Sequence, residues 1–194
     1  MGSSVQRNRL IKGFFFLFVF GFIAVWQVFT GYIDSSTVKK EKYLIKFDLN
    51  SLETGEVRIL HKTGLPLVIM RRSKQDLKNL LAIRSSLSDP DSKKSEQPSY
   101  ARNYHRSLKP EFFIAYALTP RIGHEINYRL TSYKTSLNKQ DKWFGGFSES
   151  RTGYLYDKAG RSYKQRGKNL FIPSYKITPQ NQLYVYTLKE LDFD

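Results

Sequence analysis

The sequence predicts a mainly β protein, in which one N-terminal transmembrane helix precedes an antiparallel β sandwich, and three observations lead to this prediction. An apolar run from Gly13 to Ile33 contains no charged residue. Short segments of alternating apolar and polar residues then follow between turn signals. A single segment has the apolar spacing of a helix. The length of 194 residues fits one such domain plus a small appendage.

The N-terminal apolar run is long enough to cross a bilayer, because about 20 helical residues span a hydrocarbon core of roughly 30 Å. Trp26 and Tyr32 lie near its distal end, where amphipathic rings favour the headgroup level, and Gln27 is its one strongly polar side chain. A cleaved signal peptide is the alternative, but its apolar region is normally shorter and ends at small residues. Residues 1–33 are therefore predicted to be a tail and anchor, and the polar residues 34–42 a tether.

The remaining residues, 43–190, are predicted to form the β domain. Ser73 and Asp76 resemble a capping box, and Leu77, Leu80 and Leu81 follow at helical spacing, so one short helix is expected there. Alternation or a short apolar run predicts strands at Tyr43–Asp48, Val57–Leu60, Leu67–Met70, Phe112–Ala117, close to Trp143–Phe147, and at Gln182–Thr187.

Two further segments are predicted to be irregular. Residues 85–110 are rich in Ser, Pro and charged residues, which indicates a long surface loop that could contact a partner. Asp157–Gly160 has the composition of a hairpin turn.

Composition excludes several kinds of chemistry. The chain has no cysteine, which excludes disulfides, thiolate nucleophiles and thiolate-bound metal centres, and its three histidines show no metal-binding spacing. The net charge is +15, and only three of the 32 basic residues precede Asp34. A basic domain of this kind favours anionic partners such as lipid headgroups or acidic protein faces. No nucleotide-binding or hydrolase motif occurs, and the tyrosines among the basic residues are expected to pack across strands, so no nucleic-acid partner is expected.

Three stretches resemble the Rieske iron–sulfur subunit of cytochrome bc complexes. Tyr43–Arg72 resembles the first hairpin of that family's base domain, with its strand, turn, strand and final basic pair. Asp157-Lys-Ala-Gly-Arg161 resembles the family's Asp-x-Ser-Gly-Arg, and Asn169–Tyr175 its later Asn-Leu-x-Val-Pro-x-Tyr. The similarity keeps its order over about residues 43–186, and implies a Rieske-like β sandwich head behind a membrane anchor.

The resemblance places two cluster-ligand boxes on residues that cannot act as ligands. In the first box, Thr119 takes the place of a ligand cysteine and Arg121 that of a ligand histidine. In the second, Glu149 and Thr152 take the corresponding places. A Rieske centre needs two cysteines and two histidines, so no cofactor and no metal are expected. Glu149 and Arg151 could form an ion pair in the vacated site, or both could be solvated.

The resemblance and the lost ligands together predict a non-catalytic accessory subunit of a respiratory membrane complex. The complex would be a cytochrome bc complex or its supercomplex with an oxidase. The expected contacts are Gln27 in the anchor and Lys164, Arg166 and Lys168, which replace the family's proline-rich loop over the cluster. Anionic lipid is a further expected partner. The expected location is a bacterial inner membrane with a periplasmic head, or else a mitochondrial inner membrane with its head in the intermembrane space. The alternative function is a free-standing anchored module that binds a polyanion or an acidic protein face.

Overall fold

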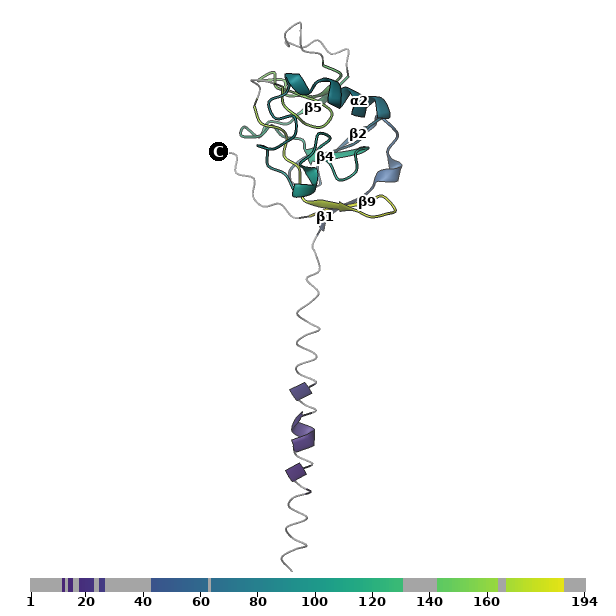
Figure 1. Cartoon of the computed structure of the whole chain (residues 1–194), viewed down its shortest axis with the longest axis vertical. Helices are drawn as coiled ribbons and strands as arrows, with labels where there is room; N and C mark the ends of the chain where they lie inside the picture. The colour runs from purple at the N-terminus through teal and green to yellow at the C-terminus, as the bar shows by residue number, and fades with distance from the viewer. Residues whose placement is uncertain are drawn as a thin grey trace, which may run out of the picture. The chain divides into compact units, whose positions relative to one another are not determined.

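The computed structural model describes residues 12, 14–15, 18–22, 25–26, 43–62, 64–130, 143–163 and 167–186. The chain divides into two compact units, Met1–Glu41 and Lys42–Asp194, and we call the second unit the head. In the first unit the described residues are helical (Figure 1). Most of the predicted span Gly13–Ile33, including Gln27, lies outside the described residues.

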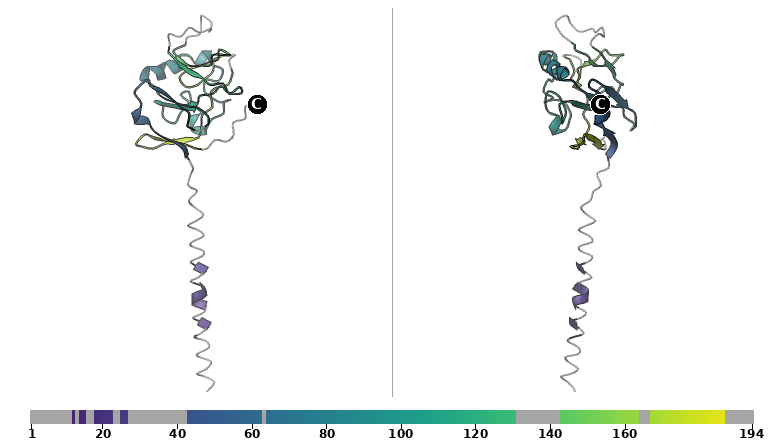
Figure 2. Two further views of the ribbon diagram at one scale, coloured as in Figure 1. Left: turned by 180° about the vertical axis from the view of Figure 1, so that it is seen from behind. Right: turned by 90° about the vertical axis from the view of Figure 1, so that its right-hand side faces the viewer.

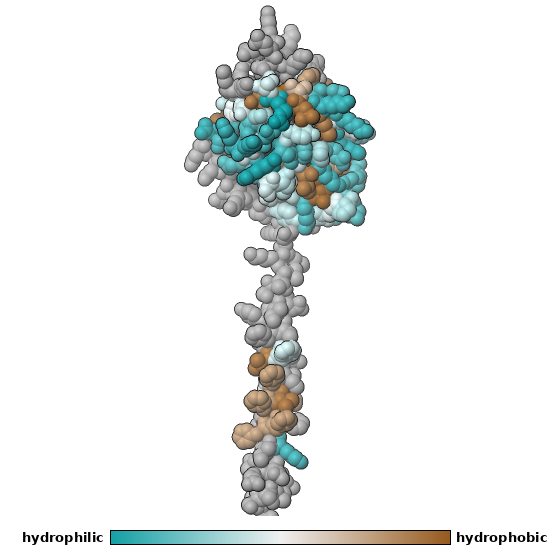
Figure 3. Space-filling model, in the orientation of Figure 1, coloured by the Kyte–Doolittle hydropathy of each residue, from teal (hydrophilic) through white to brown (hydrophobic). Residues whose placement is uncertain are grey.

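The described residues of the first unit are mostly large and apolar, and their side chains are exposed, such as Phe14, Phe18 and Trp26 (Figure 3). In the ranges that the structure describes, no helix is both long enough and apolar enough to span a membrane. The division into anchor, tether and β domain at residues 33, 42 and 190 therefore stays a prediction.

Among the described residues of the head, nine strands form three antiparallel sheets of three strands each. The terminal sheet has the order β1-β9-β8, the central sheet β2-β3-β4 and the third sheet β5-β6-β7. The strands are β1 (Tyr43–Asp48), β2 (Val57–Leu60), β3 (Leu67–Arg71), β4 (Phe112–Tyr116), β5 (Asn127–Arg129), β6 (Gly146–Ser148), β7 (Leu155–Tyr156), β8 (Tyr175–Ile177) and β9 (Gln182–Tyr186). The mainly β prediction with antiparallel sheets is confirmed.

The helices of the head are few and short. They are α2 (Lys74–Ala82) and the 3₁₀ helices η1 (Leu49–Ser51), η2 (Arg84–Ser86) and η3 (Ser99–Ala101). The predicted capping box at α2 is confirmed, since the Ser73 side chain accepts from the N–H of Asp76 at 3.0 Å and the Asp76 carboxylate accepts from the N–H of Ser73 at 2.9 Å. Further views show α2 at one side of the head (Figure 2).

Local pattern accounts for the longer strands. Ile45 is buried in β1 while Leu44 and Lys46 are exposed, as the alternation predicts, and β4 is buried along its whole length, as its apolar run predicts. The first and last strands pair, with Tyr43 opposite Tyr186, so β9 closes the domain as predicted. In Figure 1 the terminal sheet lies at one end of the head and β5 towards the other end.

One main core joins the three sheets. Buried residues of β1, β3, β4, β6, β7, β8 and β9 belong to a single cluster, and the Phe113 and Phe147 rings, 5.8 Å apart, connect the central and third sheets. A second, smaller cluster of buried apolar residues begins directly after α2 in the chain and contains Ile83, Leu87, Trp143, Leu155 and Tyr163.

Residues 85–110 form an irregular segment that is anchored from inside. Arg106 is fully buried, and its guanidinium donates to the carbonyls of Gly160 at 3.0 Å and of Leu170. Arg72 is also buried and donates to the carbonyl of His105 at 2.8 Å. Burial lowers the pKa of Arg106 to about 9 and that of Arg72 to about 10, which expresses the cost of enclosing each charge. These contacts fix one side of the segment on the core and leave the other side for solvent or a partner.

Candidate functional site

The first degenerate ligand box forms a tight loop, Thr119–His124, that leads into β5. The N–H of Thr119 donates to the carbonyl of His124 at 2.8 Å, and the N–H of Gly123 donates to the carbonyl of Thr119 at 3.0 Å. Thr119 is fully buried, and its hydroxyl accepts from the N–H of His124 at 3.0 Å. The hydroxyl of Thr119, which the motif comparison predicts to replace a ligand cysteine, therefore holds its own loop together.

The second degenerate box repeats this arrangement at Glu149–Tyr154, between β6 and β7. The N–H of Glu149 donates to the carbonyl of Tyr154 at 2.9 Å, and the N–H of Gly153 donates to the carbonyl of Glu149 at 3.0 Å. Gly153 and its counterpart Gly123 both have left-handed φ angles, 70° and 63°, which a glycine adopts without a Cβ penalty. The retained glycines thus keep both loops in the same form.

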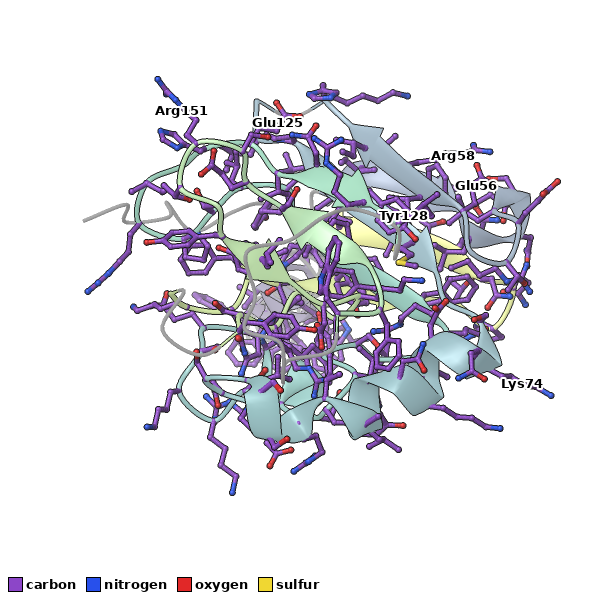
Figure 4. All side chains as sticks on the ribbon, turned by 90° about the horizontal axis from the view of Figure 1, so that it is seen from above. Glu56, Arg58, Lys74, Glu125, Tyr128 and Arg151 are labelled. Carbon is purple, nitrogen blue, oxygen red and sulfur yellow. The ribbon has the colours of Figure 1, made fainter. Side chains whose placement is uncertain are left out.

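The Glu149 carboxylate is directed into its own loop. It accepts from the N–H groups of Arg151 and Thr152, each at 2.7 Å, and from the Thr152 hydroxyl. Burial by itself would raise the pKa of Glu149, but these hydrogen bonds outweigh it, so the pKa lies below its ordinary value. Neither predicted alternative, an ion pair with Arg151 or two solvated side chains, describes the Glu149 carboxylate. The carboxylate is buried, and it accepts a hydrogen bond from the backbone N–H of Arg151. The Arg151 guanidinium instead points away from the head (Figure 4).

The two loops meet through His124 and Glu149. Asn127, the first residue of β5, pairs with Ser148, the last residue of β6, so the register brings the end of one loop beside the start of the other. His124 Nδ1 lies 3.7 Å from Glu149 Oε1. This distance is too long for a hydrogen bond, and in the described part of the chain Nδ1 has no hydrogen-bond partner. The contact is therefore an ion pair only while the imidazole carries a proton.

The residues predicted to occupy the ligand positions do not fit an iron–sulfur cluster. Such a cluster needs thiolate and imidazole ligands, and the four positions hold the side chains of Thr119, Arg121, Glu149 and Thr152. Arg121 carries a permanent positive charge, and the oxygens of Thr119 and Glu149 are already bound to backbone N–H groups. Groups of three or more metal-binding side chains are absent from the described residues. We therefore derive no redox step for this site.

A cavity of about 380 Å³ lies beside the first loop. Its walls are residues 120–122 of that loop, Tyr154 and Tyr156 on the second loop and β7, and Gly167 with Lys168. Tyr156 is buried, and this burial raises the pKa of its phenol. The cavity combines aromatic and apolar walls with the two cationic side chains of Arg121 and Lys168.

A buried ion pair between Asp157 and Arg161 directly follows β7. Asp157 Oδ2 lies 2.7 Å from both Nε and Nη2 of Arg161, and Asp157 Oδ1 accepts from the N–H groups of Ala159 and Arg161 at 2.9 Å. The Arg161 guanidinium also donates to the carbonyl of Leu80 at 2.6 Å and to that of Pro90 at 3.0 Å. The motif therefore ties β7 to α2 and to the 85–110 segment. The predicted turn at Asp157–Gly160 is confirmed by a 2.9 Å hydrogen bond between its ends.

Of the predicted contact residues, the structure describes only Lys168. Gln27, Lys164 and Arg166 lie outside the described residues. Lys168 is exposed and pairs with Glu96 at 3.7 Å. Sequence reasoning did not single out Tyr154 and Tyr156 as parts of a cavity; their position directly after the second box was the available signal.

Comparison with known proteins finds similarity to a respiratory iron–sulfur subunit. The chain is 31% identical over 133 residues to the ubiquinol-cytochrome c reductase iron-sulfur subunit of Allochromatium vinosum, covering 68% of this chain and 63% of the relative. The chain therefore spans less than two thirds of that relative's length. No protein-family model matches. A solved structure described as a hyperthermophilic respiratory Complex III aligns with 93% of this chain and 98% of its own, at 15% identity and a TM-score of 0.43.

The similarity that the motifs indicated is thus confirmed. The chain is a homologue of a ubiquinol-cytochrome c reductase iron-sulfur subunit. That the chain departs from the Rieske ligand pattern at Thr119, Arg121, Glu149 and Thr152 stays a prediction from the sequence motifs.

Proposed function

We propose that this protein, as a homologue of a respiratory iron–sulfur subunit, is a non-catalytic accessory subunit of a respiratory membrane complex. The complex would be a cytochrome bc complex or its supercomplex with an oxidase. The head would serve as a Rieske-like scaffold that makes contacts and carries no cluster. An N-terminal anchor would hold it at a bacterial inner membrane with the head in the periplasm, or at a mitochondrial inner membrane with the head in the intermembrane space.

The observation that carries this proposal is the use made of Thr119 and Glu149. Each stands where a Rieske protein has a ligand cysteine, and each binds the backbone of its own loop. The loops keep their shape by internal hydrogen bonds, so the scaffold can persist without a metal to organise it. A scaffold that persists without its chemistry is best explained by binding to other subunits.

Gentle solubilisation of the native membrane tests the proposal. A tagged chain should be recovered with the subunits of a respiratory complex, identified by mass spectrometry, and should carry no stoichiometric iron. Reduction should produce no Rieske-type paramagnetic signal. A cluster in the purified chain would contradict the non-redox role, and recovery of the chain alone would contradict the accessory role.

The alternative, a free-standing basic module, is supported by the net charge of +15. Such a module would bind polyanions in a strongly salt-dependent way, because its attraction to them would be electrostatic. Recovery without partners together with salt-sensitive polyanion binding would favour this function over the first. Recovery in a complex that survives high salt would exclude it.

A further inference from the structure

We propose that the cavity beside the first loop binds a small organic anion, that is, a molecule with a flat apolar body and a phosphate or carboxylate group. This inference goes beyond the proposed function and does not depend on it. Pockets of about 300–1,000 Å³ that combine apolar walls with a few polar groups are typical sites for small molecules. At about 380 Å³ the cavity is in this range and much larger than a bare oxyanion needs.

The walls favour a flat apolar body. Tyr154 and Tyr156 line the cavity with aromatic residues, Tyr156 being almost fully buried behind it, and Pro120 and Ile122 of the first loop add aliphatic residues. Gly167 lies close against one ring, since a Cβ added there would be 3.8 Å from the Tyr154 ring. A planar group can therefore be enclosed by aromatic and aliphatic atoms.

The charges favour an anion. Arg121 and Lys168 both line the cavity, and in the part of the chain that the structure describes no hydrogen bond or ion pair involves the Arg121 guanidinium. Among the described residues Lys168 pairs with Glu96 alone, at 3.7 Å, and both side chains are largely exposed, so a ligand can displace this weak pair. The buried carboxylates of Glu149 and Asp157 are both satisfied by other partners, Glu149 by its own loop and Asp157 by Arg161.

Arg121 also has an unfavourable backbone conformation. Its φ angle is +76°, in the left-handed region, where a residue with a Cβ is strained. Glycine would relieve this strain at once. The presence of a charged side chain at this strained position supports a binding role for Arg121.

Equilibrium dialysis of the full-length chain in a neutral detergent, with protein-free micelles as the blank, tests the proposal. The probes are 1-naphthyl phosphate, 1-naphthoate, inorganic phosphate and neutral 1-naphthol. The two aromatic anions should bind saturably at about one per chain, with a dissociation constant on the order of 1 mM or lower, as expected for about 15 heavy atoms. The stronger of the two identifies the acidic group. Absence of saturation, or equal binding of inorganic phosphate or 1-naphthol, would overturn the inference.

Variants separate binding from folding. Arg121→Gln and Lys168→Gln should each weaken 1-naphthyl phosphate binding by about three- to tenfold, whereas Glu96→Gln should strengthen it. Arg121→Gly should weaken binding without lowering the midpoint of urea unfolding. Arg151→Gln is the matched control, because this exposed arginine belongs to the second loop and does not line the cavity (Figure 4). Equal weakening by Arg151→Gln would show that binding follows net charge alone and would overturn the site.

Discussion

Replacing Glu149 tests whether its carboxylate holds the second loop. Glu149→Gln keeps the size of the side chain and one acceptor oxygen, but its amide nitrogen is a donor and cannot replace the second oxygen. Because Oε1 accepts from the N–H of Arg151 and Oε2 accepts from the N–H and hydroxyl of Thr152, the amide cannot make both sets of contacts. Glu149→Ala removes every acceptor. Arg151→Ala is the matched control, because Arg151 contributes only its backbone N–H to the carboxylate.

The expected loss follows from these contacts. A hydrogen bond to a charged group contributes about 1.5–3 kcal/mol to stability, but water can reach the exposed turn and replace part of this. We expect Glu149→Gln to lower the free energy of unfolding by about 2 kcal/mol and Glu149→Ala by about 3 kcal/mol, since alanine also loses buried methylene groups. Arg151→Ala should stay within about 0.5 kcal/mol of the parent chain.

Urea unfolding of the full-length chain at pH 7 measures these differences. With a slope of about 1–3 kcal/mol per molar urea, Glu149→Gln should lower the midpoint by about 1 M. The folded pKa of Glu149 is depressed, so its contribution is present above the unfolded pKa and is lost as the pH falls through the folded pKa. The difference between Glu149→Gln and the parent should therefore shrink below about pH 4.5, the ordinary carboxyl value.

Two results would refute this reasoning. If Arg151→Ala destabilised the chain as much as Glu149→Gln, the guanidinium would be the partner of the carboxylate after all. If Glu149→Gln changed the midpoint by less than its experimental error, the loop would not depend on this acceptor.

Three further predictions concern other parts of the chain. Burial and the charge of Arg72 lower the pKa of His105 from 6.5 to about 4, so stability should fall as the pH drops from 6.5 towards 4. Because the ring is half-buried, we expect the free energy of unfolding to fall by about 1–2 kcal/mol. Urea unfolding at several pH values should find this loss reduced in His105→Gln and unchanged in the exposed-site control His61→Gln. Gly146→Ala would place a Cβ 2.2 Å from the carbonyl oxygen of Tyr156 and should prevent stable folding by circular dichroism, whereas Gly55→Ala, with nothing within 4 Å, should cost only about 1 kcal/mol for its φ of +90°; similar losses at both positions would contradict this. Replacing residues 13–33 with a Leu/Ala span of equal length should retain membrane association but reduce co-purification with the proposed complex, because the aromatic helix and Gln27 would lose their packing partners; undiminished co-purification would leave the association to the head alone.

Sequence patterns were sufficient where structure depends on near neighbours. The capping box of α2 uses residues three positions apart, and the burial of β4 follows from an uninterrupted apolar run. The similarity of the chain to an iron–sulfur subunit was also accessible, because its motifs keep their order.

Patterns failed where the outcome depends on distant partners. Arg106 lies in a polar, serine-rich stretch that predicts solvent exposure, yet it is buried. Carbonyl groups 53 to 64 positions away accept hydrogen bonds from its guanidinium. The orientation of Glu149 was equally inaccessible. Its backbone partners are local, but its burial depends on the folded head and is not encoded in the residues next to it. The cavity required residues 120 and 168 to come together, which no local pattern encodes.

The pairing of β1 with β9 has a consequence for the order in which the head is made. Tyr43 and Tyr186 are opposite each other, so β1, which is synthesised early, can pair only after β9 has been synthesised. Contacts between such distant residues form late and slow the folding of a domain. Since β8 also pairs only with β9 in the terminal sheet, a chain that stops before Gln182 leaves both β1 and β8 with an unpaired edge. A chain truncated before Gln182 therefore differs from one that contains β9 in having an incomplete terminal sheet with exposed strand edges.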